Sequence, residues 1–295
     1  MKQQTLADGG FEKYRKKTRK EQFLDEMETI IPWEQLTEAI EPFYPNPQGA
    51  GRRPIGIERM LRIHFLQHWF NLSDPAVEES LYDSGAMRSF VGIDLGREPA
   101  PDETTICKFR HLMEKHNLGE QLFHLVNKYL QENGLKLNRG TIVDASIITA
   151  PGSTKNREKQ RGPEMKATRK GNQWYFGMKV HGDETRLWGD SAYTGKQEVN
   201  AEVAPKARIL INEKGHNRRK LTDEDRARNR EKSKVRARVE HTFGVIKQQF
   251  GYRKVRYKGL DKNAHHLFVS CALANLVLAK KPLLRRRKRL RPSYA

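Results

Sequence analysis

The chain has 295 residues, which is enough for two domains or for one large domain with a substantial core. Its 56 lysines and arginines outnumber 36 acidic residues, and the formal net charge of +20 indicates an extended polyanion as partner. Cys107 and Cys271 are the only cysteines, which excludes a disulfide framework, and we expect both to be buried reduced thiols of a cytosolic protein. The chain opens without a signal peptide pattern, and its most apolar run, 267–279, is too short to cross a bilayer. We therefore expect a soluble cytoplasmic protein with no membrane partner.

Residues 1–135 predict a helical domain. Short apolar-periodic segments alternate with Asp, Ser, Gly and Pro turns, a pattern that suits a helix-turn-helix-like module that binds DNA. A helical bundle that only docks on the next domain is the alternative, because no side chain here can be assigned to a base edge. The expected helices are 22–39 with an interruption at Pro32, 57–70, a short helix from Ser73 or Asp74 to Tyr82, 84–90, 102–116 and 118–130.

Two histidines in the helix at 57–70 raise the question of a metal site. His64 and His68 are four residues apart and share one helix face, as metal-binding pairs do. The sequence offers no third ligand nearby, so we expect core and surface roles for them.

The pattern changes after Gly140 to short β-branched and aromatic runs, which indicate strands. The run at 141–143 ends in Asp144, and the run at 187–189 ends in Asp190. An aspartate at the end of a strand is also a common turn or capping residue. Further strands are expected at 173–180 and 207–211, and the polar basic segment 153–170 is expected to be a flexible loop.

A long helix is predicted from Thr222 to Phe250. Thr222 can cap its start, and Asp225 three residues later completes a capping-box pattern. An apolar stripe runs along the helix at Val235, Val239, Phe243, Ile246 and Phe250. Arg236, Glu240 and Lys247 fall on a second stripe beside it. Glu240 is then a carboxylate between two cations, although a salt-bridged surface residue would look the same.

Taken together, two strands each deliver an aspartate and a basic helix delivers a glutamate. Three converging carboxylates supply the hard oxygen ligands that a pair of Mg²⁺ or Mn²⁺ ions needs for phosphoryl transfer. In a strongly basic chain, this combination indicates chemistry on a nucleic acid.

The same residues resemble a known family. The segments 142–146 (IVDAS), 171–179 (GNQWYFGMK) and 189–195 (GDSAYTG) are similar to the core of DDE transposases of the bacterial insertion-sequence family numbered five, in the superfamily numbered four. The third motif of that superfamily is Tyr, Arg, Glu and Lys; Arg236, Glu240 and Lys247 match it in spacing, and Ser233 stands where Tyr is usual. The helical region 57–116 is also similar to these enzymes.

The resemblance implies an α/β fold: a helical DNA-binding domain at 1–135, then an RNase H-like catalytic domain at 136–279. It implies that Asp144, Asp190 and Glu240 are catalytic and bind Mg²⁺ or Mn²⁺, and that Arg236 and Lys247 hold DNA phosphate. The chain departs from the family in one place. Members of the family usually carry another strand and a helix between the strand with GNQWYFGMK and the strand with GDSAY, and here only residues 181–185 separate the two. We expect an internal deletion there, which would leave the strand at 173–180 with an exposed edge.

The C-terminal residues 280–295 form a basic tail. We expect its cationic side chains to bind DNA phosphate non-specifically; the alternative is a disordered tail that only aids solubility. The cationic residues assigned to DNA there are Arg285, Arg286, Arg287, Lys288 and Arg289.

The function expected is that of a transposase that cleaves and joins the DNA ends of its own element, in the bacterial nucleoid. The alternatives are a DNA-binding remnant that does not cut and a general RNase H-like nuclease. A homodimer on DNA is left open.

Overall fold

The computed structural model describes residues 16–45, 53–135 and 222–290, together with six short strands between the second and third of these ranges. The chain divides into two compact units. The first unit contains Met1–Leu135 and Ala264–Ala295, and the second contains Lys136–Asn263. Residues 264–279, which the sequence analysis placed with the catalytic domain, thus group with the first 135 residues.

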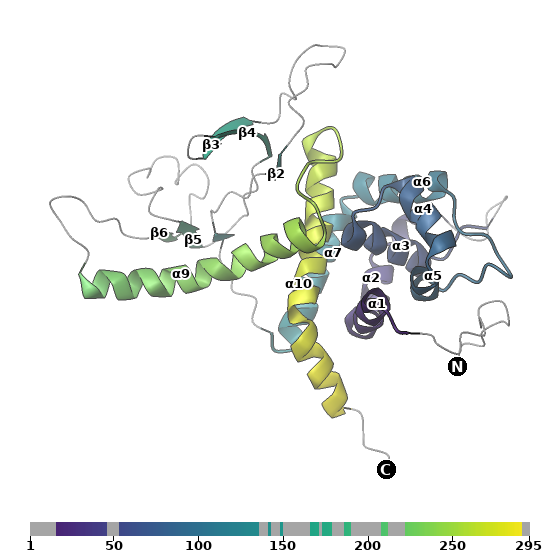
Figure 1. The fold of residues 1–295 in the computed structure, drawn as a ribbon, viewed down its shortest axis with the longest axis horizontal. Coiled ribbons are helices and arrows are strands. Elements are labelled where there is room, and N and C mark those ends of the chain that lie inside the picture. The colour runs from purple at the N-terminus through teal and green to yellow at the C-terminus, as the bar shows by residue number, and fades with distance from the viewer. Residues whose placement is uncertain are drawn as a thin grey trace. The chain divides into compact units, whose positions relative to one another are not determined.

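The helices of the first unit begin and end where their capping residues indicate. Ser73, Ser84 and Asp102 each accept a hydrogen bond from a backbone N–H of the first turn that follows, as N-cap residues do. The left-handed Asn71 and Gly92 end two of the helices. The helices are α1 (Arg19–Ile30), α2 (Trp33–Glu38), the 3-10 turn η1 (Glu41–Phe43), α3 (Ile57–Phe70), α4 (Asp74–Asp83), α5 (Gly85–Val91), α6 (Glu103–Lys115) and α7 (Leu118–Glu132) (Figure 1).

Helix α3 is the centre of this unit. Every residue from Met60 to Trp69 is buried, because α2, α4, α5 and α6 all contact it. Among these residues Arg62 is 6% exposed. Its guanidinium donates to Glu28, Glu58 and the carbonyl of Phe90, and these acceptors offset the cost of burying the charge.

Helix α10 (Leu260–Leu290) is longer than expected, and its part from Ala264 onward belongs to the first unit. The expected basic tail is helical up to Leu290, even though Pro282 lies inside the helix. Burial favours this continuation, because Leu283 is 3% exposed. By length and composition the segment Leu260–Arg287 could cross a membrane, but this is weak evidence, since core helices of soluble proteins share both properties.

The second unit contains two three-stranded sheets. In one, β1 (Thr141–Ile142), β5 (Arg186–Gly189) and β6 (Arg208–Ile211) are parallel and lie in that order. In the other, β4 (Gln173–Met178) lies between β2 (Ile148–Thr149) and β3 (Lys166–Lys170) and is antiparallel to both.

Strand β3 corrects two expectations. Its five residues fall in the segment 153–170 that was expected to be a loop. They pair along β4 from Gln173 to Gly177, so the edge of β4 expected to be exposed is covered. The described residues are mostly helical, with strands that are short.

Helix α9 (Asp223–Gly244) begins with the predicted capping box. The Thr222 hydroxyl accepts from the N–H of Asp225 at 3.2 Å, and the Asp225 carboxylate accepts from the N–H of Thr222 at 3.1 Å. The helix was expected to run regularly to Phe250, but a π-helical turn, η3 (Val245–Gln249), replaces its last turn. Each π turn holds about one residue more than an α turn, and Val245, Ile246 and Phe250 in and after it are buried.

Candidate active site and nucleic-acid interface

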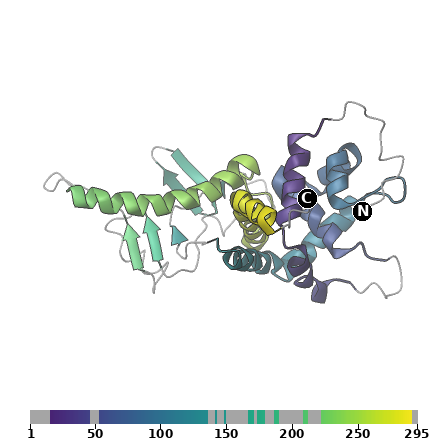
Figure 2. The same ribbon diagram turned by 90° about the horizontal axis from the view of Figure 1, so that it is seen from below.

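The parallel sheet and α9 carry the elements of the candidate active site. Strands β1 and β5 are neighbours, with Ile142 opposite Trp188. Helix α9 contacts β5 and lies across the direction of the strands of this sheet (Figure 2). The strands that precede both aspartates and the helix that carries Glu240 therefore belong to one local assembly.

The predicted site residues differ in how far the structure describes them. Asp144 and Asp190 lie outside the described residues, just beyond β1 and β5. Arg236 and Glu240 lie in α9, where the backbone alone is described. Lys247 lies in η3, is half-buried, and its carbonyl accepts a hydrogen bond from the side chain of Arg253 at 3.2 Å.

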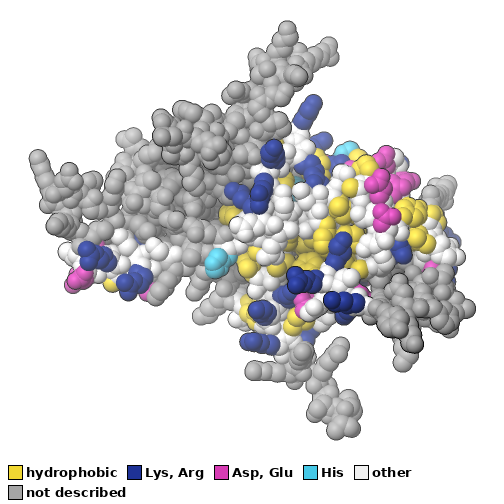
Figure 3. Space-filling model, in the orientation of Figure 1, with side chains coloured by type: hydrophobic (Ala, Val, Ile, Leu, Met, Phe, Trp, Pro, Cys, Tyr) yellow, Lys and Arg dark blue, Asp and Glu magenta, His cyan; other side chains and the backbone are white. Residues whose placement is uncertain are grey.

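The C-terminal cations lie on α10 rather than on a tail. Arg285, Arg286 and Arg287 are exposed, while Lys288 and Arg289 are helical with side chains outside the described set. Lys280 is half-buried and pairs with Glu26 at 2.5 Å, so an acidic neighbour offsets its charge. Lysine and arginine side chains are spread over the described surface (Figure 3).

Sequence reasoning missed a cluster of four buried histidines in the first unit. His64 and His68 of α3 meet His265 and His266 of α10, with ring centroids 5.9 Å apart for His64–His265 and 4.1 Å for His68–His266. The signal was the pair of adjacent histidines at 265–266, but nothing in the sequence indicates that it packs on α3. Among the described residues no three His, Cys, Asp or Glu side chains are arranged to hold a metal ion. All four side chains are buried, so the cluster is part of the core.

Burial controls the protonation of this cluster. It lowers the pKa of His64 to about 4, with a further lowering from the charge of Arg110 and partial compensation by Gln67 and Asp74. Burial likewise lowers the pKa of His265 to about 3, assisted by His64 and Arg110. Both imidazoles are neutral near pH 7.

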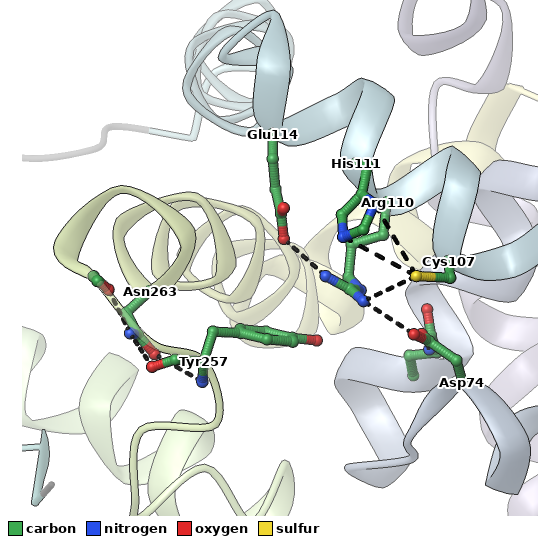
Figure 4. A network of polar contacts seen from close by, with 9 residues as sticks. Asp74, Cys107, Arg110, His111, Glu114, Tyr257 and Asn263 are labelled. Carbon is green, nitrogen blue, oxygen red and sulfur yellow. Dashed lines mark hydrogen bonds and ion pairs between the residues drawn. The ribbon is translucent and has the colours of Figure 1, made fainter. Parts of the chain in front are cut away.

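Arg110 organises the polar contacts beside this cluster (Figure 4). It donates to Asp74 at 2.9 Å, to Glu114 at 3.0 Å and to the sulfur of Cys107 at 3.4 Å. Cys107 and Cys271 are free thiols, as expected, but both are half-buried, so the expectation that they are buried was wrong.

Comparison with protein families gives two matches. Residues 12–112 match a family described as Transposase domain (DUF772), and residues 183–276 match one described as Transposase DDE domain. Together the matches support a DDE transposase. No solved structure matches the chain significantly.

The boundaries of these matches bear on the site. The DDE match contains Asp190, Arg236, Glu240 and Lys247, whereas Asp144 and β4 precede it. A transposase acts on DNA, which agrees with the net charge of +20. DDE transposases in general use divalent metal ions.

Proposed function

We propose that this transposase binds the ends of its insertion sequence and catalyses DNA cleavage and strand transfer, with Asp144, Asp190 and Glu240 as the metal-binding residues of an RNase H-like domain. The observation that carries the proposal is the register of β1 and β5. The two strands are parallel, Ile142 lies opposite Trp188, and an aspartate follows each of these residues two positions later. A register continued by two residues would make the aspartates neighbours on adjacent strands, roughly 5 Å apart. The contact between α9 and β5 supports Glu240 as the third member.

Three carboxylates suit Mg²⁺ or Mn²⁺, because both ions prefer oxygen ligands. Bound there, a metal pair would supply Lewis-acid activation of the attacking water or 3′-hydroxyl and of the leaving oxygen. The role of the chain is then to hold the scissile phosphate in line for displacement. Arg236 and Lys247 are one and two turns from Glu240 along the chain, and we assign them to the neighbouring phosphates.

Cleavage of DNA that carries the element's ends, with Mg²⁺ or Mn²⁺ added, tests this assignment. Asp144→Ala, Asp190→Ala and Glu240→Ala should each abolish cleavage and leave DNA binding in place. Glu231→Ala is the matched control, because Glu231 is an exposed glutamate of α9 nine residues earlier, on the opposite side of the helix. Cleavage that survives Asp190→Ala would refute the triad.

The same assay decides between the alternatives. A chain that binds the ends but does not cut them, with or without metal, is a DNA-binding remnant. A chain that cuts but does not join ends is a general RNase H-like nuclease. The short connection at 181–185 favours the remnant, since we attribute it to an internal deletion. The covered edge of β4 opposes it, because the expected damage to that strand is absent from the described sheet.

We propose that the exposed arginines of α10 bind DNA phosphates through counterion release. Truncation should begin at Arg285, because Leu283 is buried and its removal would damage the core. A chain lacking 285–295 should show a weaker salt dependence of DNA affinity and an unchanged preference for the element's ends. An unchanged salt dependence would assign these cations to solubility alone.

A further inference from the structure

The segment 251–259 (GYRKVRYKG), here called the basic loop, connects η3 to α10 in the second unit. It carries four cationic residues and no acidic one. Arg253, Lys254 and Lys258 are exposed, and Arg256 is half-buried. The loop therefore presents concentrated positive charge at the surface.

A fully buried side chain fixes the backbone of this loop. Asn263 is 0% exposed. Its amide nitrogen donates to the carbonyls of Tyr257 at 2.7 Å and Gly259 at 2.6 Å (Figure 4). Its amide oxygen accepts from the hydroxyl of Tyr252 at 3.2 Å and from the N–H of Tyr257 at 3.4 Å. The amide thus uses both of its donors and both of its acceptor positions in hydrogen bonds to the basic loop.

Both ends of the loop are also fixed. Gly251 and Gly259 have φ values of 69° and 88°, which glycine adopts without strain. Tyr252 is 2% exposed and its N–H donates to the carbonyl of Ile246 at 3.0 Å, so the loop starts from the core. Burial also raises the pKa of the Tyr252 hydroxyl, which therefore stays protonated and able to donate to Asn263.

A loop that served only as a connection would need neither this charge nor a buried four-bond anchor. A rigid loop loses little conformational entropy when it binds a partner, and the cations it holds in place contact phosphates at low cost. We propose that the basic loop is a DNA-backbone contact of the transposase, with Lys254 and Lys258 on phosphates and Asn263 as a positioning residue. This inference rests on the proposed function, since it requires that the chain binds DNA.

Salt titration of binding to a duplex oligonucleotide tests the contact. The double variant Lys254→Gln/Lys258→Gln should lower the slope of log affinity against log salt by about 2, since each phosphate contact contributes about 0.9. The matched control is Lys17→Gln/Lys128→Gln. It removes the same charge from two exposed lysines that pair with Asp25 and Glu132, and its slope should stay near that of the unaltered chain.

Asn263→Ala tests the positioning role. Its charge is unchanged, so the slope should persist, while affinity at fixed salt should fall because the loop must be ordered on binding. The measurement is made where circular dichroism shows the variant folded. A folded Asn263→Ala chain with unchanged affinity would overturn the positioning role. If this variant does not fold, the lysine pair alone decides.

The outcomes separate the two proposals. An unaltered chain without salt-dependent DNA binding would refute the proposed function and this inference with it. An unaltered chain that binds, together with a Lys254→Gln/Lys258→Gln variant that keeps its full slope, would refute the basic loop alone.

Discussion

The buried histidines should make the helical unit sensitive to mild acid. His64 and His265 have pKa values of about 4 and about 3 in the folded chain, against 6.5 for an ordinary histidine. A lowered folded pKa means that the stability is complete above the unfolded pKa and is lost as pH falls toward the folded value. Stability is therefore lost between about pH 6.5 and about pH 4, and acidification from about pH 7.5 to about pH 5 covers the upper part of this range.

The size of the effect follows from the unfolded state. A pH of about 5 lies about 1.5 units below the pKa of an unfolded histidine, and each pH unit below that pKa favours unfolding by about 1.4 kcal/mol. His64 and His265 therefore cost about 2 kcal/mol each, or about 4 kcal/mol together. Whole domains are stable by only about 5–15 kcal/mol, so the loss is large. Asp74 raises the pKa of His64 in part, while the charge of Arg110 lowers it, and these opposing effects are included in the value of about 4.

Urea unfolding at the two pH values measures this loss. A background with Trp174→Phe and Trp188→Phe leaves the fluorescence of Trp33 and Trp69, both in the helical unit. His64→Leu should remove about half of the pH difference, about 2 kcal/mol, whatever it does to stability at neutral pH. His124→Leu is the control, because His124 is exposed on α7. A His64→Leu/His265→Leu chain that kept the full pH difference would show that these two histidines are not its source.

Two substitutions test packing in the same unit by urea unfolding, and a third, in α9 of the second unit, is a control. Arg62→Met should lower the free energy of unfolding by about 2–3 kcal/mol, because it leaves the Phe90 carbonyl unpaired. The loss is limited because the half-exposed Glu28 and Glu58 can return to water. A loss below about 1 kcal/mol would contradict a stabilising role for the contacts of Arg62. Gly119→Ala should cost about 1–3 kcal/mol, because its Cβ would lie 2.6 Å from the His265 ring and 3.0 Å from its carbonyl. At Gly244 an added Cβ would have no atom within 4 Å, so Gly244→Ala should stabilise α9 by up to about 1 kcal/mol. Equal changes in the free energy of unfolding at the two glycines would refute the close contact between Gly119 and His265.

Local signals account for what the sequence predicted well. The capping residues Ser73, Ser84, Asp102 and Thr222 and the break at Pro32 act within one helical turn, so the helices start close to their expected positions. Features that depend on distant partners were missed. Strand β3 forms from a polar segment because β4 offers it a pairing edge, and the histidine cluster forms because α10 packs against α3.

The functional residues likewise include some that the sequence indicated and one that it did not. Strand ends, helix spacing and family resemblance pointed to Asp144, Asp190 and Glu240, and the neighbouring placement of β1, β5 and α9 is what such a site requires. The triad itself stays a prediction. Asn263 could not be found from sequence, because an amide in a helix shows no sign that its four hydrogen bonds go to a loop before it.

The position of β3 also bears on aggregation. Strand β4 has the sequence QWYFGM, with three consecutive aromatic residues and no charge, and such a strand at the edge of a sheet would pair readily with other copies. On one side of β4 the described sheet instead ends in β3, whose sequence KATRK has three cations among five residues. Like charges on an edge strand repel a second copy of the same edge. On this side of β4 the short basic strand thus disfavours pairing with a second copy of the chain.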